Sequence, residues 1–127
     1  MRGGDPIHSS VELATGEVWW ASPDATVGRE QSGRRPVLVV ASQRYLDQVD
    51  TLALVVPLTT RDRGWSNHVL VTAEPALPEA CFAMTEQLRA ISRERLVSRL
   101  GRAFEPCMEA VQKWLVEYLV EDPDLLR

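Results

Sequence analysis

Residues 33–40 read Gly-Arg-Arg-Pro-Val-Leu-Val-Val, and this stretch decides the fold. The apolar run from Val37 to Val40 is too short for a helix and mostly β-branched, so it predicts a buried strand. Pro36 cannot donate to a sheet ladder and is expected at the first position of that strand, where it restricts the backbone of Arg35. Taken alone, Arg35 is either a solvated charge or a ligand for an anion.

Further short strands are predicted on both sides of this stretch. They cover residues 16–21, 51–58, 68–72, 80–85 with a possible continuation over 88–91, and 96–102. Several short strands at this spacing indicate a small barrel, and Pro57 predicts an edge or a break in one ladder. Residues 43–49 and 92–96 are typical of single helical turns. After Pro106, apolar residues recur at helical spacing and predict a C-terminal amphipathic helix of roughly four turns.

Length and composition favour one ordinary domain. The chain has 127 residues, of which 45% are hydrophobic and 25% charged. No apolar run approaches the ~20 residues of a membrane span, so we expect no membrane association. The N-terminus lacks the apolar core of a secretory signal, and Cys81 and Cys107 are expected to be free thiols in a reducing cytoplasm. Ligands are too sparse for a metal cluster, and no cofactor is expected.

The charge is unevenly distributed along the chain. The net charge is -4, but residues 1–28 carry one base against four acids and residues 103–127 carry two against six. The remaining 29–102 hold eleven bases against eight acids, a surplus of +3. The predicted strands therefore carry a modest basic surplus.

The usual protein nucleophiles are poorly represented. The sequence has no Gly-x-Ser-x-Gly elbow, and neither cysteine has an evident histidine partner. His68 is either a structural residue at a strand start or a proton-transfer group. What remains is arginine with threonine, which suits a substrate that brings its own nucleophile. RNA is such a substrate, since its 2′-hydroxyl lies beside the phosphate, and Arg35 and Thr59 would stabilise that phosphate if their loops converge.

Four segments resemble, in order, the motifs of the MazF/PemK family, the toxin endoribonucleases of bacterial toxin–antitoxin pairs. They are Gly-Glu-Val-Trp at 16–19, Gly-Arg-Glu-Gln-Ser-Gly-Arg-Arg-Pro-Val-Leu-Val at 28–39, Val-Pro-Leu-Thr-Thr-Arg-Asp-Arg-Gly-Trp at 56–65 and Thr-Glu-Gln-Leu-Arg at 85–89. The resemblance implies a mainly β (α+β) fold, a small SH3-like β-barrel of the PemK/CcdB type with short helical turns and a C-terminal α-helix. It places the toxin domain at 15–121, between a flexible arm at 1–14 and a tail at 122–127.

The same resemblance implies a two-fold homodimer that cuts single-stranded RNA without metal and leaves a cyclic phosphate. Arg35 matches the family's catalytic arginine and Thr59 its catalytic threonine. Glu30 either orients Arg35 or contacts a base. The other residues expected to support the site or bind substrate are Gln31, Arg34, Thr60, Arg61, Trp65 and Gln87. Trp65 either stacks on a base or packs against the barrel or the dimer partner.

The resemblance also implies a MazE-like antitoxin as partner. A basic mouth around Arg29, Arg34, Arg35 and Arg61 would accept an acidic, partly disordered segment that competes with RNA. Two other functions stay open. One is a gyrase-poisoning binder on the same scaffold, although the chain does not end in the Trp-Gly-Ile of those toxins. The other is a catalytically silent member that only binds an antitoxin.

Overall fold

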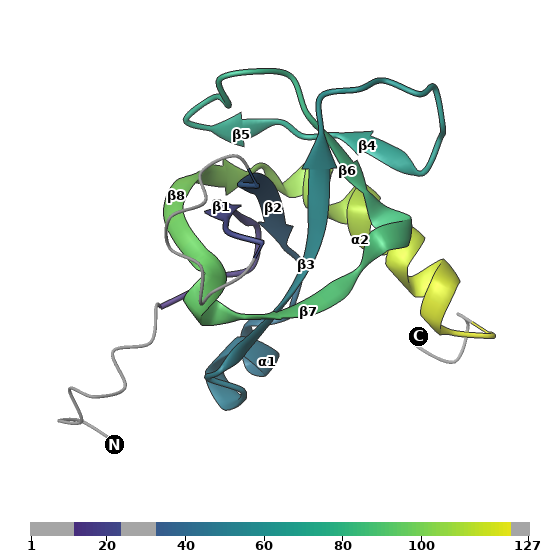
Figure 1. Ribbon diagram of the computed structural model, residues 1–127. Coiled ribbons are helices and arrows are strands. Elements are labelled where there is room, and N and C mark those ends of the chain that lie inside the picture. The colour runs from purple at the N-terminus through teal and green to yellow at the C-terminus, as the bar shows by residue number, and fades with distance from the viewer. Residues whose placement is uncertain (1–11, 24–32, 123–127) are drawn as a thin grey trace, which may run out of the picture.

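The computed structural model describes residues 12–23 and 33–122 (Figure 1). Its strands are β1 (Glu17–Ala21), β2 (Arg35–Val39), β3 (Leu52–Thr59), β4 (His68–Leu70), β5 (Ala73–Glu74), β6 (Phe82–Met84), β7 (Arg89–Ser92) and β8 (Leu96–Ala103). Its helices are α1 (Gln43–Gln48) and α2 (Glu105–Leu119), with short 3-10 turns η2 (Thr85–Gln87) and η3 (Arg93–Arg95). The expected mainly β fold with a C-terminal helix is confirmed.

Strand β3 is the centre of the sheet and changes partners along its length. One edge pairs with β2, while the other pairs first with β7 over Leu52 to Val55 and then with β6 over Leu58 and Thr59. Pro57 lies between these two ladders, because it has no amide hydrogen to give to either. The predicted break in the ladder is therefore confirmed, and it lets the sheet split into two differently directed parts.

The rest of the sheet curls around this split. The strand order is β4-β6-β3-β2-β1-β8-β5, and every pairing is antiparallel. The register between β1 and β8 shifts twice, between Val18 and Trp19 and again between Trp20 and Ala21. Such irregularities increase twist and bend a strand, so this part of the sheet curves toward a half-barrel.

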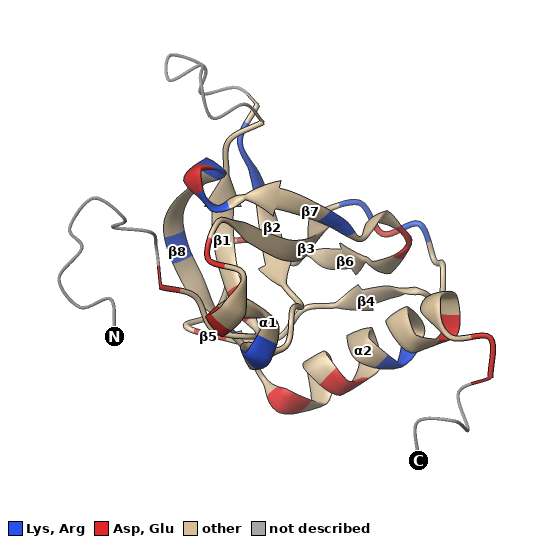
Figure 2. Ribbon diagram, turned by 90° about the horizontal axis from the view of Figure 1, so that it is seen from below, with Lys and Arg blue, Asp and Glu red and all other residues tan. Residues whose placement is uncertain are grey.

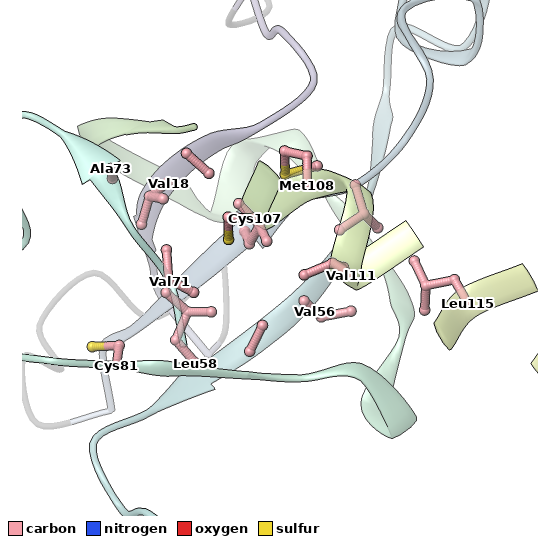
Figure 3. Close-up of a cluster of buried hydrophobic side chains, with 14 residues drawn as sticks. Val18, Val56, Leu58, Val71, Ala73, Cys81, Cys107, Met108, Val111 and Leu115 are labelled. Atoms are coloured by element: carbon pink, nitrogen blue, oxygen red, sulfur yellow. The ribbon is translucent and has the colours of Figure 1, made fainter. Parts of the chain in front are cut away.

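The two faces of the curled sheet have separate cores. One lies under α2, whose Cys107, Met108, Val111 and Leu115 point toward β-strand residues that include Val56 (Figure 3). The apolar spacing that predicts the helix thus corresponds to its buried face. The other core lies on the opposite face and includes Val37, Val39 and Val55 together with Leu46 of α1; its remaining buried members are Leu13, Ala21, Ala41, Ala53, Ile91 and Leu96.

A buried arginine joins α1 to the sheet. Arg93 is 6% exposed, and its guanidinium donates to the carbonyl oxygens of Leu46 (2.6 Å), Val49 (2.9 Å) and Leu52 (3.0 Å). The oxygens of Leu46 and Val49 are at the C-terminal end of α1, where carbonyls lack helical partners. Arg93 therefore stabilises a helix of six residues that is too short to be stable by itself.

Several expectations need correction. Strand β2 begins at Arg35, so Pro36 is its second residue and not its first. The turn η2 separates 80–91 into β6 and β7, so 88–91 does not continue the preceding strand. The strand β5 was not predicted. No helix in the described part of the chain is long and apolar enough to cross a membrane.

Candidate functional site

Arg35 and Thr59 lie at the same end of two neighbouring strands. Val37 of β2 pairs with Pro57 of β3, and Arg35 and Thr59 are each two residues beyond that pair. Because side chains alternate along a strand, both residues project from the face that carries Val37. The Arg35 side chain is exposed and Thr59 is half-buried. The β2–β3 register thus brings the two segments together, which is the condition for Arg35 and Thr59 to act on one phosphate.

The hydroxyl of Thr59 has a defined hydrogen-bond partner. Its Oγ1 accepts from the backbone N–H of Arg61 at 3.1 Å, which bends the chain out of β3. Asp62 accepts from the N–H of Gly64 at 2.9 Å, and Gly64 has a φ of +74°, where a glycine is favoured. A hydroxyl that uses an oxygen lone pair in this way keeps its hydrogen, so Thr59 can still donate.

A pocket of about 130 Å³ lies next to Arg35. Its apolar walls come from the face of the sheet that packs on α1, and three guanidiniums from β2, β7 and η3 line it. The lining residues are Ala21, Pro23, Gly33, Arg35, Val37, Val55, Pro57, Arg89, Ile91 and Arg95. Arg89 and Ile91 alternate along β7 and share this face, since they pair with Val55 and Ala53 of β3. Thr59 does not line the pocket.

The charged side chains of the pocket are not neutralised by the described lining residues. None of those residues is acidic, and within 12–23 and 33–122 the guanidiniums of Arg35 and Arg89 make no hydrogen bond or ion pair. Arg95 donates from Nε to the carbonyl oxygen of Ser22 at 2.7 Å, which holds its side chain at the pocket. Like charges over an apolar floor favour binding of an anion.

A second polar group lies where β4, η2 and α2 meet. His68 is 7% exposed, and its Nε2 lies 3.1 Å from both carboxylate oxygens of Glu86. Because a carboxylate only accepts, Nε2 carries the proton and donates. Asn67 also donates to Glu86, at 3.0 Å. His68 is therefore held as a structural residue by Glu86, and this arrangement favours the structural alternative for it.

The hydroxyl of Tyr118 connects Asn67 of this group to Thr85. It accepts from the side-chain amide of Asn67 at 3.0 Å and lies 2.9 Å from the hydroxyl of Thr85. The Thr85 hydroxyl donates its hydrogen to the carbonyl oxygen of Asn67 at 2.6 Å, so Tyr118 must be the donor to Thr85. The three residues form a closed ring of hydrogen bonds that attaches the end of α2 to η2.

The charge of Glu86 is stabilised within this group. Partial burial by itself would raise the pKa of the Glu86 carboxyl, but the hydrogen bonds from His68, its own backbone N–H and Gln87, together with the charge of His68, lower that pKa. Glu86 is thus a carboxylate that hydrogen bonds keep ionised. That environment does not suit a general acid.

Trp65 lies beside His68 of this hydrogen-bonded group. Trp65 is 51% exposed, its ring lies 4.8 Å from the His68 ring at 54°, and the Arg63 guanidinium lies 5.6 Å from the Trp65 ring centroid. This exposure leaves room for a stacking partner, while His68 and Arg63 limit the orientation of the ring.

The remaining predicted residues are less closely grouped. Glu30 and Gln31, like Arg29, lie outside the described residues. Arg34, Thr60 and Arg61 are exposed around the outer ends of β2 and β3. Gln87 is exposed in η2, and its amide lies 3.7 Å from the sulfur of Met84. The basic segments at the start of β2, in β7 and after β3 contrast with α2, where acidic residues predominate (Figure 2).

The sequence predictions omitted Arg89 and Arg95 of the pocket and Glu86, which holds His68. The signal for Arg89 was present, because Arg89 and Ile91 alternate in a strand and must share a face. The signals for Glu86 and Arg95 were absent, since their partners His68 and Ser22 are 18 and 73 residues away in sequence.

The thiols are free but unsuited to nucleophilic attack. Cys81 and Cys107 are both buried and unbridged, as expected. Burial raises the pKa of both thiols, with Glu79 adding to the effect at Cys81. Because the thiolate is the reactive form, neither residue is a plausible nucleophile near neutral pH.

Comparison with known proteins identifies a family model and curated relatives that match this chain. A family model described as the PemK-like, MazF-like toxin of type II toxin–antitoxin systems matches residues 14–119. The endoribonuclease MazF9 of Mycobacterium tuberculosis is 33% identical over 96 residues, covering 71% of this chain and 81% of that protein. The endoribonuclease PemK of Escherichia coli is 43% identical over 54 residues, 42% of this chain and 40% of PemK.

The structural comparison agrees. The crystal structure of MazF from Deinococcus radiodurans superposes with a TM-score of 0.69 at 26% identity, covering 86% of this chain and 97% of that one. Its curled sheet with a C-terminal helix is the fold described above. The chain belongs to the PemK-like, MazF-like toxin family of type II toxin–antitoxin systems.

Proposed function

We propose that this protein is a metal-independent endoribonuclease toxin that cuts single-stranded RNA at the corner formed by Arg35 and Thr59. The observation that carries this proposal is the β2–β3 register, which brings the Arg35 guanidinium, without a partner among the described residues, and an available hydroxyl to one face and one end of the sheet. Relatives of the chain are named endoribonucleases, which supports the same activity.

The reaction needs no nucleophile from the protein. The 2′-oxygen of the substrate attacks the adjacent phosphorus, the bond from phosphorus to the 5′-oxygen breaks, and the products are a 2′,3′-cyclic phosphate and a 5′-hydroxyl. One proton leaves the 2′-hydroxyl and one reaches the departing oxygen. Arg35 neutralises the charge that develops on the phosphate and assists proton transfer, and Thr59 donates a hydrogen bond to a phosphate oxygen.

The surrounding residues bind the substrate. Arg34, Arg61 and Thr60 lie around the strand ends from which Arg35 and Thr59 project, and their charges and hydroxyl suit RNA phosphates. Trp65 offers a half-exposed ring for base stacking. Glu30, Gln31 and Gln87 complete the set of supporting residues implied by the family motifs.

The partners follow from the family. The protein acts as a homodimer in the cytoplasm and is inhibited by a cognate antitoxin, whose acidic, partly disordered segment covers the basic corner. The absence of acidic side chains among the described pocket-lining residues supports this charge complementarity. In the same proposal residues 15–121 form the toxin domain, with an arm at 1–14 and a tail at 122–127.

The test is cleavage of single-stranded RNA by the purified protein in excess chelator. We expect cleavage with a cyclic-phosphate terminus, and none by an Arg35→Ala/Thr59→Ala double variant that melts at the wild-type temperature. Intact RNA with wild-type protein, or equal cleavage by the double variant, would contradict the proposal. A gyrase supercoiling assay on the same preparation separates the enzyme from a gyrase-poisoning binder.

A further inference from the structure

The arginine pocket extends beyond the residues that the cleavage step requires. We propose that Arg89 and Arg95, with the apolar floor between them and Arg35, form a subsite for one nucleotide flanking the cleaved bond. In this subsite Arg89 binds the nucleotide's phosphate and the base lies against the floor. The inference rests on the proposed RNA-cleaving function and extends it to a specific substrate-binding residue.

The charge of the pocket indicates an anionic ligand. Three guanidiniums line about 130 Å³ of space, and the other described lining residues are apolar or glycine. Arg89 has no hydrogen-bond or ion-pair partner in the described structure. Like charges so arranged repel one another unless an anion lies between them, and the guanidinium fork matches a phosphate.

The shape of the pocket indicates that the anion carries an apolar or flat group. The floor is formed by Val37, Val55, Pro57 and Ile91, none of which can recognise a free phosphate. The volume is several times the ~30 Å³ share of one liquid water, and well below the ~300 Å³ at which pockets for drug-sized ligands begin. One nucleotide offers both a phosphate for the rim and a ring face for the floor.

The position of the pocket connects it to the cleavage corner. Arg35 belongs to both, because it lines the pocket and lies at the same end of the sheet as Thr59. A single strand whose phosphate is held by Arg35 and Thr59 therefore has its next nucleotide beside the pocket. An acidic peptide would use the same guanidiniums, but this continuity with the cleavage corner favours RNA.

Rigid supports keep these arginines in place. Arg89 belongs to a strand paired with β3, and the Arg95 side chain donates to the carbonyl oxygen of Ser22. At the edge of the pocket, a Cβ added to Gly33 would lie 2.5 Å from Cγ of Pro23, so only glycine allows this close packing. A site built on a paired strand and on a hydrogen-bonded side chain loses less entropy when it binds, which favours affinity.

The test measures binding separately from cleavage. In a Thr59→Ala background, fluorescence anisotropy follows the binding of a labelled single-stranded RNA that the wild type cuts, over a series of salt concentrations. Added Arg89→Ala is expected to weaken binding about tenfold and to make the slope of log K against log salt shallower by about one. Arg89→Lys keeps the charge and should retain the slope.

Arg44→Ala is the matched control, because Arg44 is an exposed arginine on α1 outside the pocket. It should change neither affinity nor slope, and a melting curve verifies that each variant is folded. Equal binding with and without Arg89 would overturn the subsite. The subsite would also be overturned if Arg89→Ala weakened the binding of an acidic antitoxin peptide but left RNA binding unchanged. Failure of the wild type to cut any RNA is a different result and would count against the proposed function.

Discussion

Glu86 and Arg89 are three residues apart, yet the surroundings of their charges differ: neighbouring side chains donate hydrogen bonds to Glu86, and no described residue accepts one from the Arg89 side chain. Glu86 accepts hydrogen bonds from His68 and Asn67 within a closed group that reaches Tyr118. Arg89 lines a pocket with two other arginines and has no partner in the described structure. A charge whose hydrogen bonds are satisfied internally stabilises the fold, whereas a charge such as that of Arg89, with no partner among the described residues, is available for a ligand.

The largest effect is expected at Arg35, which has no hydrogen-bond or ion-pair partner among the described residues. Arg35→Ala is expected to slow RNA cleavage by ~100 to 1,000-fold, because one well-placed transition-state donor is lost. Its free energy of unfolding should stay within about 0.5 kcal/mol of the wild type, as Arg35 is exposed. Single-turnover rates and urea melts on the same preparation measure both. A large loss of stability with normal cleavage would mean that Arg35 stabilises the fold and takes no part in cleavage.

The paired group should show the opposite pattern. Glu86→Ala leaves the donors of His68 and Asn67 without their acceptor and should lower the free energy of unfolding by about 1 to 3 kcal/mol. Glu86→Gln retains an acceptor oxygen and should cost less. Urea denaturation measures the difference. If Glu86→Ala is as stable as the wild type but catalytically dead, Glu86 belongs to the active site instead.

A smaller effect is expected at Tyr118. Tyr118→Phe removes the hydroxyl that links Asn67 to Thr85 and should cost about 0.5 to 1.5 kcal/mol. Tyr45→Phe is a suitable control, because the Tyr45 hydroxyl makes no hydrogen bond within the described residues. Thermal melts of the two variants should therefore differ. Equal melting temperatures would show that the ring contributes nothing measurable.

The smallest effect is a dependence on pH. The pKa of Glu86 is lowered from 4.5, so its carboxylate contributes stability that is complete above that value. The contribution is lost as pH falls through the lowered pKa. The difference in melting temperature between wild type and Glu86→Gln should therefore shrink as pH falls from about 6 to about 3. A constant difference would mean that the Glu86 charge is not stabilised by its neighbours.

The comparison also shows what the sequence could predict. Periodicity located β2, β3 and α2, since each buries a continuous apolar stripe or run. It could not predict that η2 separates β6 from β7, because that turn depends on Thr85 and Glu86 bonding to Asn67 and His68. Arg93 resembled its charged neighbours in sequence, but it is buried and donates to three carbonyl oxygens that are distant in the chain.

The candidate site also combines residues that the sequence could identify with a pocket that it could not. Arg35 and Thr59 could be identified from local motifs and family resemblance, because each stands at a marked position at one end of a predicted strand. The pocket could not, since it requires residues of β2, β3, β7 and η3 to curl around one space. That curvature results from the register shifts of β1 and from the partner change at Pro57, which are tertiary features.

In the proposed mechanism, the corner formed by Arg35 and Thr59 cuts RNA through the substrate's own 2′-hydroxyl. The most direct measurement compares an RNA oligonucleotide with the same oligonucleotide carrying one 2′-deoxy nucleotide at the mapped cleavage position, both in chelator. We expect the protein to bind both strands with similar affinity and to cut only the all-ribose strand, leaving a cyclic phosphate. Cleavage of the deoxy-substituted strand at the same bond would contradict it.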